Sequence, residues 1–465
     1  MTARVVIGGV SSNVGKTTVT VALARALRAR GLRVALFKCG PDYLDPTYHG
    51  RAIDGAGHTL DGWMMGRDAV RATFARAAHG ADVALIEGVM GLFDGASPTG
   101  EEGSTAEIAK WLDAPVVLVC DASGMARSVA ALAQGFASFD REVRVAGLIC
   151  NRVGSRGHLE LLRRATAAPP VVGGFTVDDA MSFPERHLGL RTADRDAVPD
   201  ALFDRWGERA AAELDVDAIL AIARTAPAIE TAPSALASAS IETSGVRMPR
   251  RCRIGLAFDP AFHFYYEDNL RRLEALGAEL VRFSPIEDAR LPDVDGLYLG
   301  GGYPEVYARA LAANASMREA VRAFAASGRP IYAECGGLMY LSRAIRTLDG
   351  AEHAMVGLVP AVAEMRDRLQ ALGYVEVETQ AATPLGPAGV RFRGHQFRYS
   401  ELRVDDDAAA AAAIEHVYTV RRRRGGEVTR EGYRRGNVLA SYVHAHWASN
   451  PTVADHFVGA CAERS

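Results

Sequence analysis

The segment VVIGGVSSNVGKTTVTVALARAL near the N-terminus constrains the fold more than any other part of the chain. An apolar run leads into a loop of small residues, then Gly-Lys-Thr, then an amphipathic helical pattern. This order is typical of a phosphate-binding loop, whose backbone N–H groups surround phosphate oxygens while a lysine adds positive charge and a hydroxyl binds Mg²⁺. The predicted ATP-binding residues of this loop are Ser12, Asn13, Val14, Gly15, Lys16, Thr17 and Thr18.

The loop departs from the strict pattern GxxxxGK[ST]. Val10 stands where that pattern has glycine, and Gly9 lies one residue too early. Because Gly-Lys-Thr also arises by chance, an ordinary glycine-rich turn is the alternative interpretation. The position of the loop between a predicted strand at 5–10 and a predicted helix at 16–30 favours nucleotide binding.

Both halves of the chain alternate short apolar runs with helical patterns. This rhythm is typical of α/β domains in which helices cover both faces of a parallel sheet. A stretch rich in Ala, Ser, Thr and Pro interrupts it and predicts a linker at 225–251, which leaves domains at 1–224 and 252–465. Further predicted strands are 33–38, 83–87, 115–120, 145–150, 253–258, 279–283, 296–299 and 330–334, with a helix at 268–276 and a surface helix or loop at 408–413.

Composition excludes several classes of function. The 465 residues carry a net charge of -3, which argues against a nucleic-acid partner. The sequence has no apolar run near the ~20 residues of a membrane helix and no signal peptide, so we expect a cytoplasmic protein without a membrane partner. Its six cysteines lack CxxC spacing, which argues against a zinc or disulfide framework. The sequence leaves a homodimer open.

Four acidic residues follow predicted strands of the first half. Asp42 and Asp45 lie in PDYLDP, and Glu87 and Asp94 lie in IEGVMGLFDG. Ligands of parallel sheets gather at the carboxyl ends of strands, and Mg²⁺ prefers oxygen ligands. We expect Asp45 and Glu87 to join Thr17 around Mg²⁺. Turn and helix-cap chemistry is the alternative for all four acids.

A candidate nucleophile lies in RPIYAECGGLMYL, where Cys335 separates an apolar strand from a helix. The glycines that follow resemble a nucleophile elbow, a tight turn that raises a reactive side chain above the sheet. We expect the Gly336 N–H to face an oxyanion and the helix N-terminus to favour the thiolate. The upstream motif LYLGGGYPE supplies Gly301 and Gly302 as further oxyanion donors. A buried structural cysteine is the alternative.

A candidate base lies in SYVHAHW, which places His444 and His446 on the same side of an extended segment. Either imidazole could accept a thiol proton. The alternatives are two histidines satisfied within the core, or a metal-binding pair. With the glycines around Cys335, the catalytic interpretation is favoured, and we expect His444 to be the base.

Several long motifs together resemble the cobyrinic acid or hydrogenobyrinic acid a,c-diamide synthase family. The resemblance covers nearly the whole chain apart from the linker and rests on KCGPDYLDPTYH, IEGVMGLFDG, DASGMARSVAAL, YLGGGYPE, YAECGGLMYL and SYVHAHW. It implies two doubly wound α/β domains: a P-loop NTPase-like domain similar to dethiobiotin synthetase, and a flavodoxin-like class I glutamine amidotransferase domain.

The resemblance also implies a reaction and a set of roles. ATP phosphorylates the c and then the a acetate carboxylate of a corrinoid in cobalamin biosynthesis, and ammonia released from glutamine attacks each acyl phosphate. Thr17, Asp45 and Glu87 correspond to the metal and phosphate shell, and Cys335 and His444 to the glutamine site. The positions near the substrate carboxylate are Asp42, Tyr43, Leu44 and Asp94. Asn151 resembles an adenine-contacting position, with a core-to-loop cap as the alternative.

Two departures from the family pattern affect the predicted roles. Class I amidotransferases commonly carry His-x-Glu at the base, whereas this chain has His444-Ala445-His446, which favours a Cys–His dyad. An orienting role of His446 toward His444 is the alternative. In RGHQFRYS, Gln396 and Arg398 replace the usual Glu and His. Any role of that acid therefore does not transfer to this chain.

Three other classes of protein remain as alternatives. Cobyric acid synthase and nickel-sirohydrochlorin a,c-diamide synthase amidate other tetrapyrrole carboxylates, but ECGGLMYL and PDYLDP favour the a,c-diamide group. A dethiobiotin-synthetase-like carboxylase would not need the domain that carries Cys335. A partition-type ATPase often has an extra lysine where this chain has Ser11.

Overall fold

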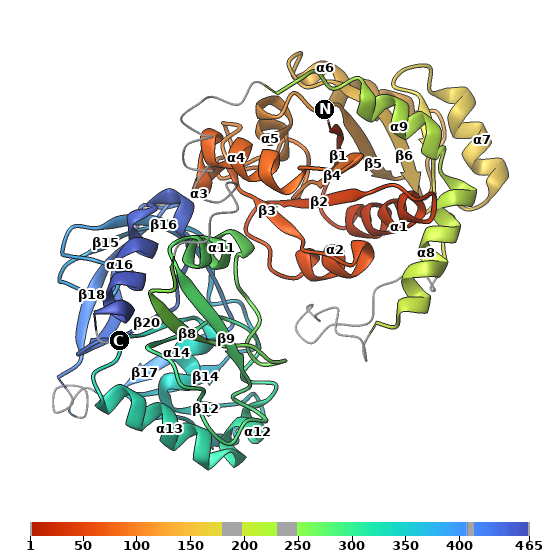
Figure 1. Cartoon of the computed structure of the whole chain (residues 1–465). Helices are drawn as coiled ribbons and strands as arrows, with labels where there is room; N and C mark the ends of the chain where they lie inside the picture. Colours follow the sequence, from red (N-terminus) through yellow and green to blue (C-terminus); the bar gives the residue numbers. More distant parts are fainter. Residues whose placement is uncertain (1, 179–197, 230–248, 406, 408–412, 464–465) are drawn as a thin grey trace. The chain divides into compact units, whose positions relative to one another are not determined.

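The computed structural model describes residues 2–178, 198–229, 249–405, 407 and 413–463. The chain forms two compact units, Met1–Ser240 and Ile241–Ser465 (Figure 1). Most of the predicted linker, at 230–248, and most of the alanine run, at 408–412, lie outside the described residues. The first unit contains strands β1 (Ala3–Gly9), β2 (Val34–Cys39), β3 (His58–Leu60), β4 (Val83–Glu87), β5 (Val116–Asp121), β6 (Val145–Asn151) and β7 (Val171–Gly173), and helices α1 (Lys16–Ala29), α2 (Asp45–Ile53), α3 (Gly62–Met65), α4 (Arg67–Ala77), α5 (Thr105–Trp111), α6 (Ser128–Phe139), α7 (Arg156–Ala165), α8 (Asp200–Glu213) and α9 (Val216–Arg224).

The sheet of the first unit has seven strands in the order β3-β2-β4-β1-β5-β6-β7, and all its neighbouring strands are parallel. Because these strands are parallel, the loops after β1, β2 and β4 lie at one edge of the sheet. The strand order also reverses direction around β1, and such a reversal creates a crevice at the carboxyl ends of the strands. The predicted phosphate loop and the predicted acidic residues therefore share this edge.

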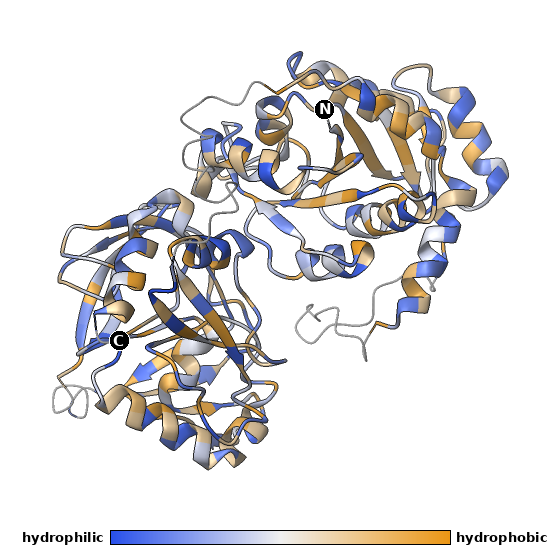
Figure 2. Ribbon diagram, in the orientation of Figure 1, coloured by the Kyte–Doolittle hydropathy of each residue, from blue (hydrophilic) through white to orange (hydrophobic). Residues whose placement is uncertain are grey.

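One hydrophobic core of the first unit lies between the sheet and helices α1, α8 and α9. Its members include the fully buried Val5, Leu85, Phe203 and Trp206. Central strands of this sheet consist largely of hydrophobic residues (Figure 2). Burial of apolar side chains at about 25 cal/mol per Å² is the main term that stabilises such a layer. The segment that follows α9 also contacts this unit, because the Arg4 guanidinium donates a hydrogen bond to the Pro227 carbonyl at 2.6 Å.

The second unit combines a large mixed sheet with a small one. A ten-stranded sheet and a four-stranded sheet are both present among the described residues. Its strands are β8 (Cys252–Ala257), β9 (Ala278–Phe283), β10 (Gly296–Leu299), β11 (Ile331–Glu334), β12 (Ser342–Arg346), β13 (Glu352–Ala354), β14 (Val359–Met365), β15 (Ala371–Thr379), β16 (Arg391–Arg398), β17 (Ser400–Val404), β18 (Glu415–Arg422), β19 (Val428–Arg435), β20 (Val438–Ser441) and β21 (His444–His446), and its helices are α11 (Glu267–Ala275), α12 (Ala308–Ala313), α13 (Ala315–Ala326), α14 (Gly336–Leu341), the 3₁₀ helix η2 (Trp447–Ser449) and α16 (Thr452–Ala462).

The large sheet runs β21-β16-β15-β18-β19-β20-β11-β10-β8-β9. Strands β20, β11, β10, β8 and β9 pair in parallel, and the remaining neighbours pair antiparallel. The parallel part carries the predicted doubly wound arrangement, while the antiparallel extension and the small sheet were not predicted. A core around Tyr298, Tyr332, Trp447 and Phe457 packs beneath the large sheet.

Among the described residues, every helix is too short or too polar to span a membrane. The predicted elements agree closely with those observed: β4 and β10 have the predicted bounds, and the other predicted strands and helices differ by at most two residues at each end.

Candidate functional site

The phosphate loop joins β1 to α1. Its early glycine, Gly9, lies against the side chain of Lys16. A Cβ atom at Gly9 would lie 2.8 Å from Lys16 Cδ and 3.0 Å from the Ser11 carbonyl oxygen. A side chain at position 9 would therefore displace the lysine side chain where it crosses the loop. Asn13 and Gly15 adopt φ angles of 61° and 91°, which turn the backbone sharply before the helix.

The Lys16 ammonium folds back over this loop. Its Nζ donates to the carbonyls of Ser11 at 3.0 Å and Met90 at 2.6 Å. Burial and the nearby Lys38 together lower the pKa of Lys16 to about 8, while Glu87 and Asp45 oppose this shift. A bound anion would raise the pKa of this desolvated ammonium again.

The predicted metal shell converges at the carboxyl edge of the sheet. The Thr17 hydroxyl donates to Glu87 Oε1 at 2.6 Å and lies 3.4 Å from Asp45 Oδ2. Glu87 ends β4, Asp45 begins α2 and Thr17 lies in the first turn of α1. The structure therefore brings together three oxygen donors that the sequence placed far apart.

Two basic side chains that sequence analysis missed lie within this cluster. Lys38 Nζ lies 2.6 Å from Asp45 Oδ2 and 2.8 Å from Glu87 Oε1. His49 Nε2 lies 2.6 Å from Glu87 Oε2, and both side chains are fully buried. The sequence signal for Lys38 was a lysine inside an apolar strand, because a buried cation needs acidic partners nearby.

The pKa values of Asp45 and Glu87 are shifted in opposite directions. Burial and the nearby Asp42 raise the pKa of Asp45 to about 7, against the opposing effect of Lys38. Burial would also raise the pKa of Glu87, but Lys38 and His49 outweigh it and hold that pKa well below its usual range. Glu87 is therefore ionised at neutral pH, and Asp45 titrates there.

The oxygen donors fit Mg²⁺, and the glycine-lined loop fits a nucleotide phosphate. The described residues contain no group of three or more His, Cys, Asp or Glu side chains placed to hold a metal. Mg²⁺ is usually held by one or two carboxylates together with substrate phosphates and waters. Thr17, Asp45 and Glu87 are the residues that would hold the ion.

The predicted substrate residues lie in two loops at the same edge. Asp42 Oδ1 accepts the backbone N–H groups of Leu44 at 2.8 Å and Asp45 at 3.1 Å, so the carboxylate shapes the turn before α2. Tyr43 and Leu44 are buried. The exposed Asp94 accepts the Gly91 N–H at 3.0 Å. These contacts agree with turn chemistry, and roles toward a substrate stay predictions.

Asn151 connects the end of β6 to the phosphate loop. Its Nδ2 donates to the Val14 carbonyl at 2.8 Å. The adjacent Arg152, which the sequence analysis did not select, donates to the Asn13 carbonyl at 2.8 Å and pairs with Asp121 at 2.6 Å. Contact with adenine stays a prediction for Asn151.

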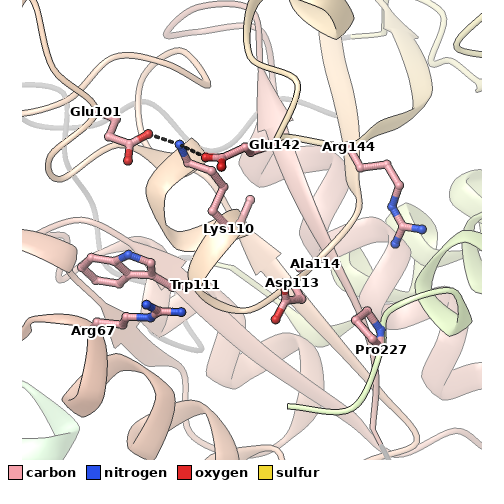
Figure 3. Close-up of a pocket in the computed structure, with 10 residues that line it drawn as sticks. Arg67, Glu101, Lys110, Trp111, Asp113, Ala114, Glu142, Arg144 and Pro227 are labelled. Carbon is pink, nitrogen blue, oxygen red and sulfur yellow. Dashed lines mark hydrogen bonds and ion pairs between the residues drawn. The ribbon is translucent and has the colours of Figure 1, made fainter. Parts of the chain in front are cut away.

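A separate charged cavity of about 580 Å³ lies elsewhere in the first unit (Figure 3). Asp113 and Ala114 precede β5 and Arg144 precedes β6, so the cavity lies at the amino ends of these strands. Lys110 in its wall is already paired with Asp140 at 3.0 Å. The cavity contains none of the predicted site residues and lies at the sheet edge opposite the phosphate loop.

In the second unit, Cys335 occupies a strained turn between β11 and α14. Its φ and ψ angles are 48° and −100°, a left-handed backbone that non-glycine residues rarely adopt. The Cys335 N–H donates to the Ser441 carbonyl at 2.7 Å, and Sγ lies 4.0 Å from the Phe397 carbonyl oxygen. The backbone therefore forms the elbow that the sequence predicted.

The predicted oxyanion glycines and the predicted base surround this elbow. A Cβ atom at Gly336 would lie 3.1 Å from the Gly302 nitrogen. A Cβ atom at Gly301 would lie 2.5 Å from His444 Cε1. His444 therefore packs against Gly301, and Gly336, the residue after Cys335, packs against Gly302.

The ionisation of this pair is set mainly by burial. Burial and the nearby Glu305 together raise the pKa of Cys335 to about 12, while Arg398 and the Gly336 N–H oppose the shift. Burial lowers the pKa of His444 to about 3. The Gly336 N–H at the start of α14 favours the thiolate as expected, but burial outweighs it and leaves the resting thiol neutral.

The second histidine of the motif has a structural contact. His446 Nδ1 accepts the Ala448 N–H at 3.3 Å and caps η2. The His395 ring, from RGHQFRYS, stacks on His444 with centroids 4.9 Å apart, and its Nδ1 lies 3.0 Å from the Tyr266 hydroxyl. His395 was not predicted from the sequence, because only the pairing of β16 with β21 brings it opposite His444.

Comparison with known proteins finds a matching family for each unit of the chain. Residues 5–185 match the family described as the CobQ/CobB/MinD/ParA nucleotide binding domain, and residues 253–452 match the CobB/CobQ-like glutamine amidotransferase domain. A cobyrinate a,c-diamide synthase of Leptospira interrogans is 51% identical over 462 residues, which cover 99% of each chain. This chain belongs to the cobyrinate a,c-diamide synthase family. Relatives with the same description from Syntrophotalea carbinolica and Priestia megaterium are 50% and 40% identical, over 99% and 98% of this chain and 99% and 97% of theirs.

Membership of the cobyrinate a,c-diamide synthase family makes the chain a glutamine-dependent amidating ligase with a nucleotide-binding domain. The two departures noted in the sequence are visible in the fold. Gln396 is buried in β16, and the Arg398 guanidinium lies 4.5 Å from the centroid of the Tyr442 ring. The Cys–His dyad stays a prediction.

Proposed function

We propose that this chain converts the a and c acetate carboxylates of cobyrinic acid or hydrogenobyrinic acid to amides in cobalamin biosynthesis, with ATP, Mg²⁺ and glutamine as co-reactants. We assign the synthetase chemistry to residues 1–224 and the glutaminase chemistry to 252–465, joined by a linker at 225–251. A cytoplasmic setting follows, because ATP and glutamine are cytoplasmic metabolites. The observation that carries this proposal is the presence of a phosphate loop and a cysteine elbow in one chain of this family.

The first half-reaction supplies an electrophile, since a carboxylate is too unreactive to be attacked by ammonia. Transfer of the γ-phosphoryl group from ATP to a carboxylate oxygen yields an acyl phosphate and ADP. Bound Mg²⁺ would neutralise charge on the phosphates. The loop N–H groups and Lys16 hold the phosphates, and Lys38 keeps Asp45 and Glu87 together beside them.

The second half-reaction releases ammonia. Cys335 attacks the glutamine carboxamide while His444 accepts the thiol proton and passes it to the leaving ammonia. The N–H groups of Gly336 and the segment at 301–302 stabilise the oxyanion. Water then hydrolyses the thioester to glutamate and regenerates the thiol. Ammonia attacks the acyl phosphate and expels inorganic phosphate, and the cycle is repeated at the second carboxylate.

Mass spectrometry of the corrinoid tests the proposal. Each amidation replaces a hydroxyl group by an amino group, which is lighter. The diamide is therefore lighter than the substrate by twice the mass difference between these two groups. We expect this change with ATP, Mg²⁺ and glutamine, and the better of cobyrinic acid and hydrogenobyrinic acid identifies the substrate. Cys335→Ala should abolish amidation with glutamine and retain it with ammonium salts. An unchanged mass with both corrinoids and either nitrogen source contradicts the proposal.

A further inference from the structure

The backbone of Ala445, between the two histidines of the HAH motif, is held by two buried side chains. The Ala445 N–H donates to Glu334 Oε1 at 2.9 Å. The Ala445 carbonyl accepts from Asn269 Nδ2, also at 2.9 Å. Because β21 is the outermost strand of its sheet, these side chains satisfy backbone groups that no further strand pairs.

Glu334 is committed to this contact from a buried position. It is 1% exposed, and its oxygens also accept the hydroxyls of Tyr332 at 2.6 Å and Tyr298 at 3.0 Å. Among the described residues it forms no ion pair with a lysine, arginine or histidine. Burial raises the pKa of Glu334 to about 7, against the opposing hydrogen bonds. A carboxylate is costly here, and three donors compensate it.

Asn269 completes the arrangement from helix α11. It is 1% exposed, and its Oδ1 accepts the Trp447 N–H at 2.9 Å while its amide holds Ala445. One side chain therefore fixes the backbone on both sides of His446. Glu334 holds the same open edge of this segment and directly precedes Cys335 in the chain, so it connects the nucleophile to the segment that carries the base.

We propose that Glu334 and Asn269 are positioning residues for His444, which hold its backbone in place of the acid that orients the imidazole in a catalytic triad. This inference rests on the proposed glutaminase function. The chain has His446 where a triad would have glutamate, and that ring caps η2 instead. The fixed backbone, the close packing of Gly301 and the stacked His395 ring together restrict rotation of the His444 imidazole.

The test compares Glu334→Ala, Glu334→Gln and Asn269→Ala in the full-length chain, with Asn314→Ala as the matched control. Asn314 also caps a helix and donates to loop carbonyls in this unit, but it lies outside the glutamine site. Steady-state glutaminase kinetics are measured for each variant, together with amidation driven by ammonium salts. Circular dichroism verifies the fold.

We expect Glu334→Ala and Asn269→Ala to lower the glutaminase kcat about 100-fold, as a misplacement of about 1 Å would, with KM within about twofold. Ammonium-driven amidation stays at the wild-type level. Glu334→Gln recovers most of the rate, because its carbonyl oxygen still accepts the Ala445 N–H. Asn314→Ala keeps the wild-type kcat.

Three results would overturn the inference: an unchanged kcat in both alanine variants, a rise in KM alone, or an equal loss of glutamine- and ammonium-driven amidation. If Glu334→Ala fails to fold, Asn269→Ala decides by the same criteria. A folded wild-type chain without glutaminase activity would instead refute the proposed function, and the inference with it.

Discussion

The resting state of Cys335 leads to a sharp prediction about its reactivity with pH. The thiolate is the reactive species, and a free cysteine has a pKa near 8.5. Burial raises the pKa of Cys335 to about 12. At pH 8 only about 1 in 10⁴ molecules would carry the thiolate, against roughly a quarter for a free thiol, so alkylation should be roughly a thousandfold slower.

The assay is the rate of iodoacetamide labelling, followed by mass spectrometry of the peptide that contains Cys335. Cys335→Ser identifies that peptide, and all the free cysteines of the described chain are buried. Over about three units from pH 7, the rate should rise by about tenfold per unit, as expected for a neutral thiol below its pKa. A plateau below pH 8 would show a thiolate–imidazolium pair at rest and refute this reasoning.

Three further predictions concern single side chains. Lys38→Met leaves Asp45 and Glu87 without their buried cation and should lower the free energy of unfolding by about 3–5 kcal/mol in urea titrations. The control Arg33→Met removes an exposed ion pair and should lower it by about 1 kcal/mol at most. Equal losses in the two variants would contradict this reasoning. Gly9→Ala should weaken binding of a fluorescent ATP analogue by about tenfold or more, because its methyl group displaces Lys16, whereas Gly135→Ala meets no atom within 4 Å and should bind normally. Gly301→Ala pushes against His444 and should lower the glutaminase kcat while ammonium-driven amidation persists; a wild-type kcat would show that the base tolerates displacement.

Much of the fold could be predicted from local sequence patterns. Buried parallel strands such as β4 and β10 read as apolar runs, and their bounds follow directly from them. The antiparallel strands β15 to β19 are half exposed and less distinct in the sequence. Their pairing depends on long-range contacts, which a local pattern does not contain.

The candidate site divides in the same way. The phosphate loop and the Cys335 elbow are contiguous motifs with a required backbone shape, so the sequence indicates them directly. Lys38 and His395 act through partners distant in the chain, and only the folded sheet brings them to Glu87 and His444. The neutral resting state of Cys335 could not be predicted from the sequence, because burial, the largest cause of its raised pKa, is a property of the packed structure.

The central claim is that ATP activates a corrinoid carboxylate as an acyl phosphate and that glutamine supplies the nitrogen. The most direct test incubates the chain with ATP, Mg²⁺, amide-¹⁵N glutamine and a corrinoid whose carboxylates carry ¹⁸O. The account predicts ¹⁵N in both new amides and one ¹⁸O atom in inorganic phosphate for each amide formed. Recovery of ¹⁸O in AMP, or an amide without ¹⁵N, would contradict it.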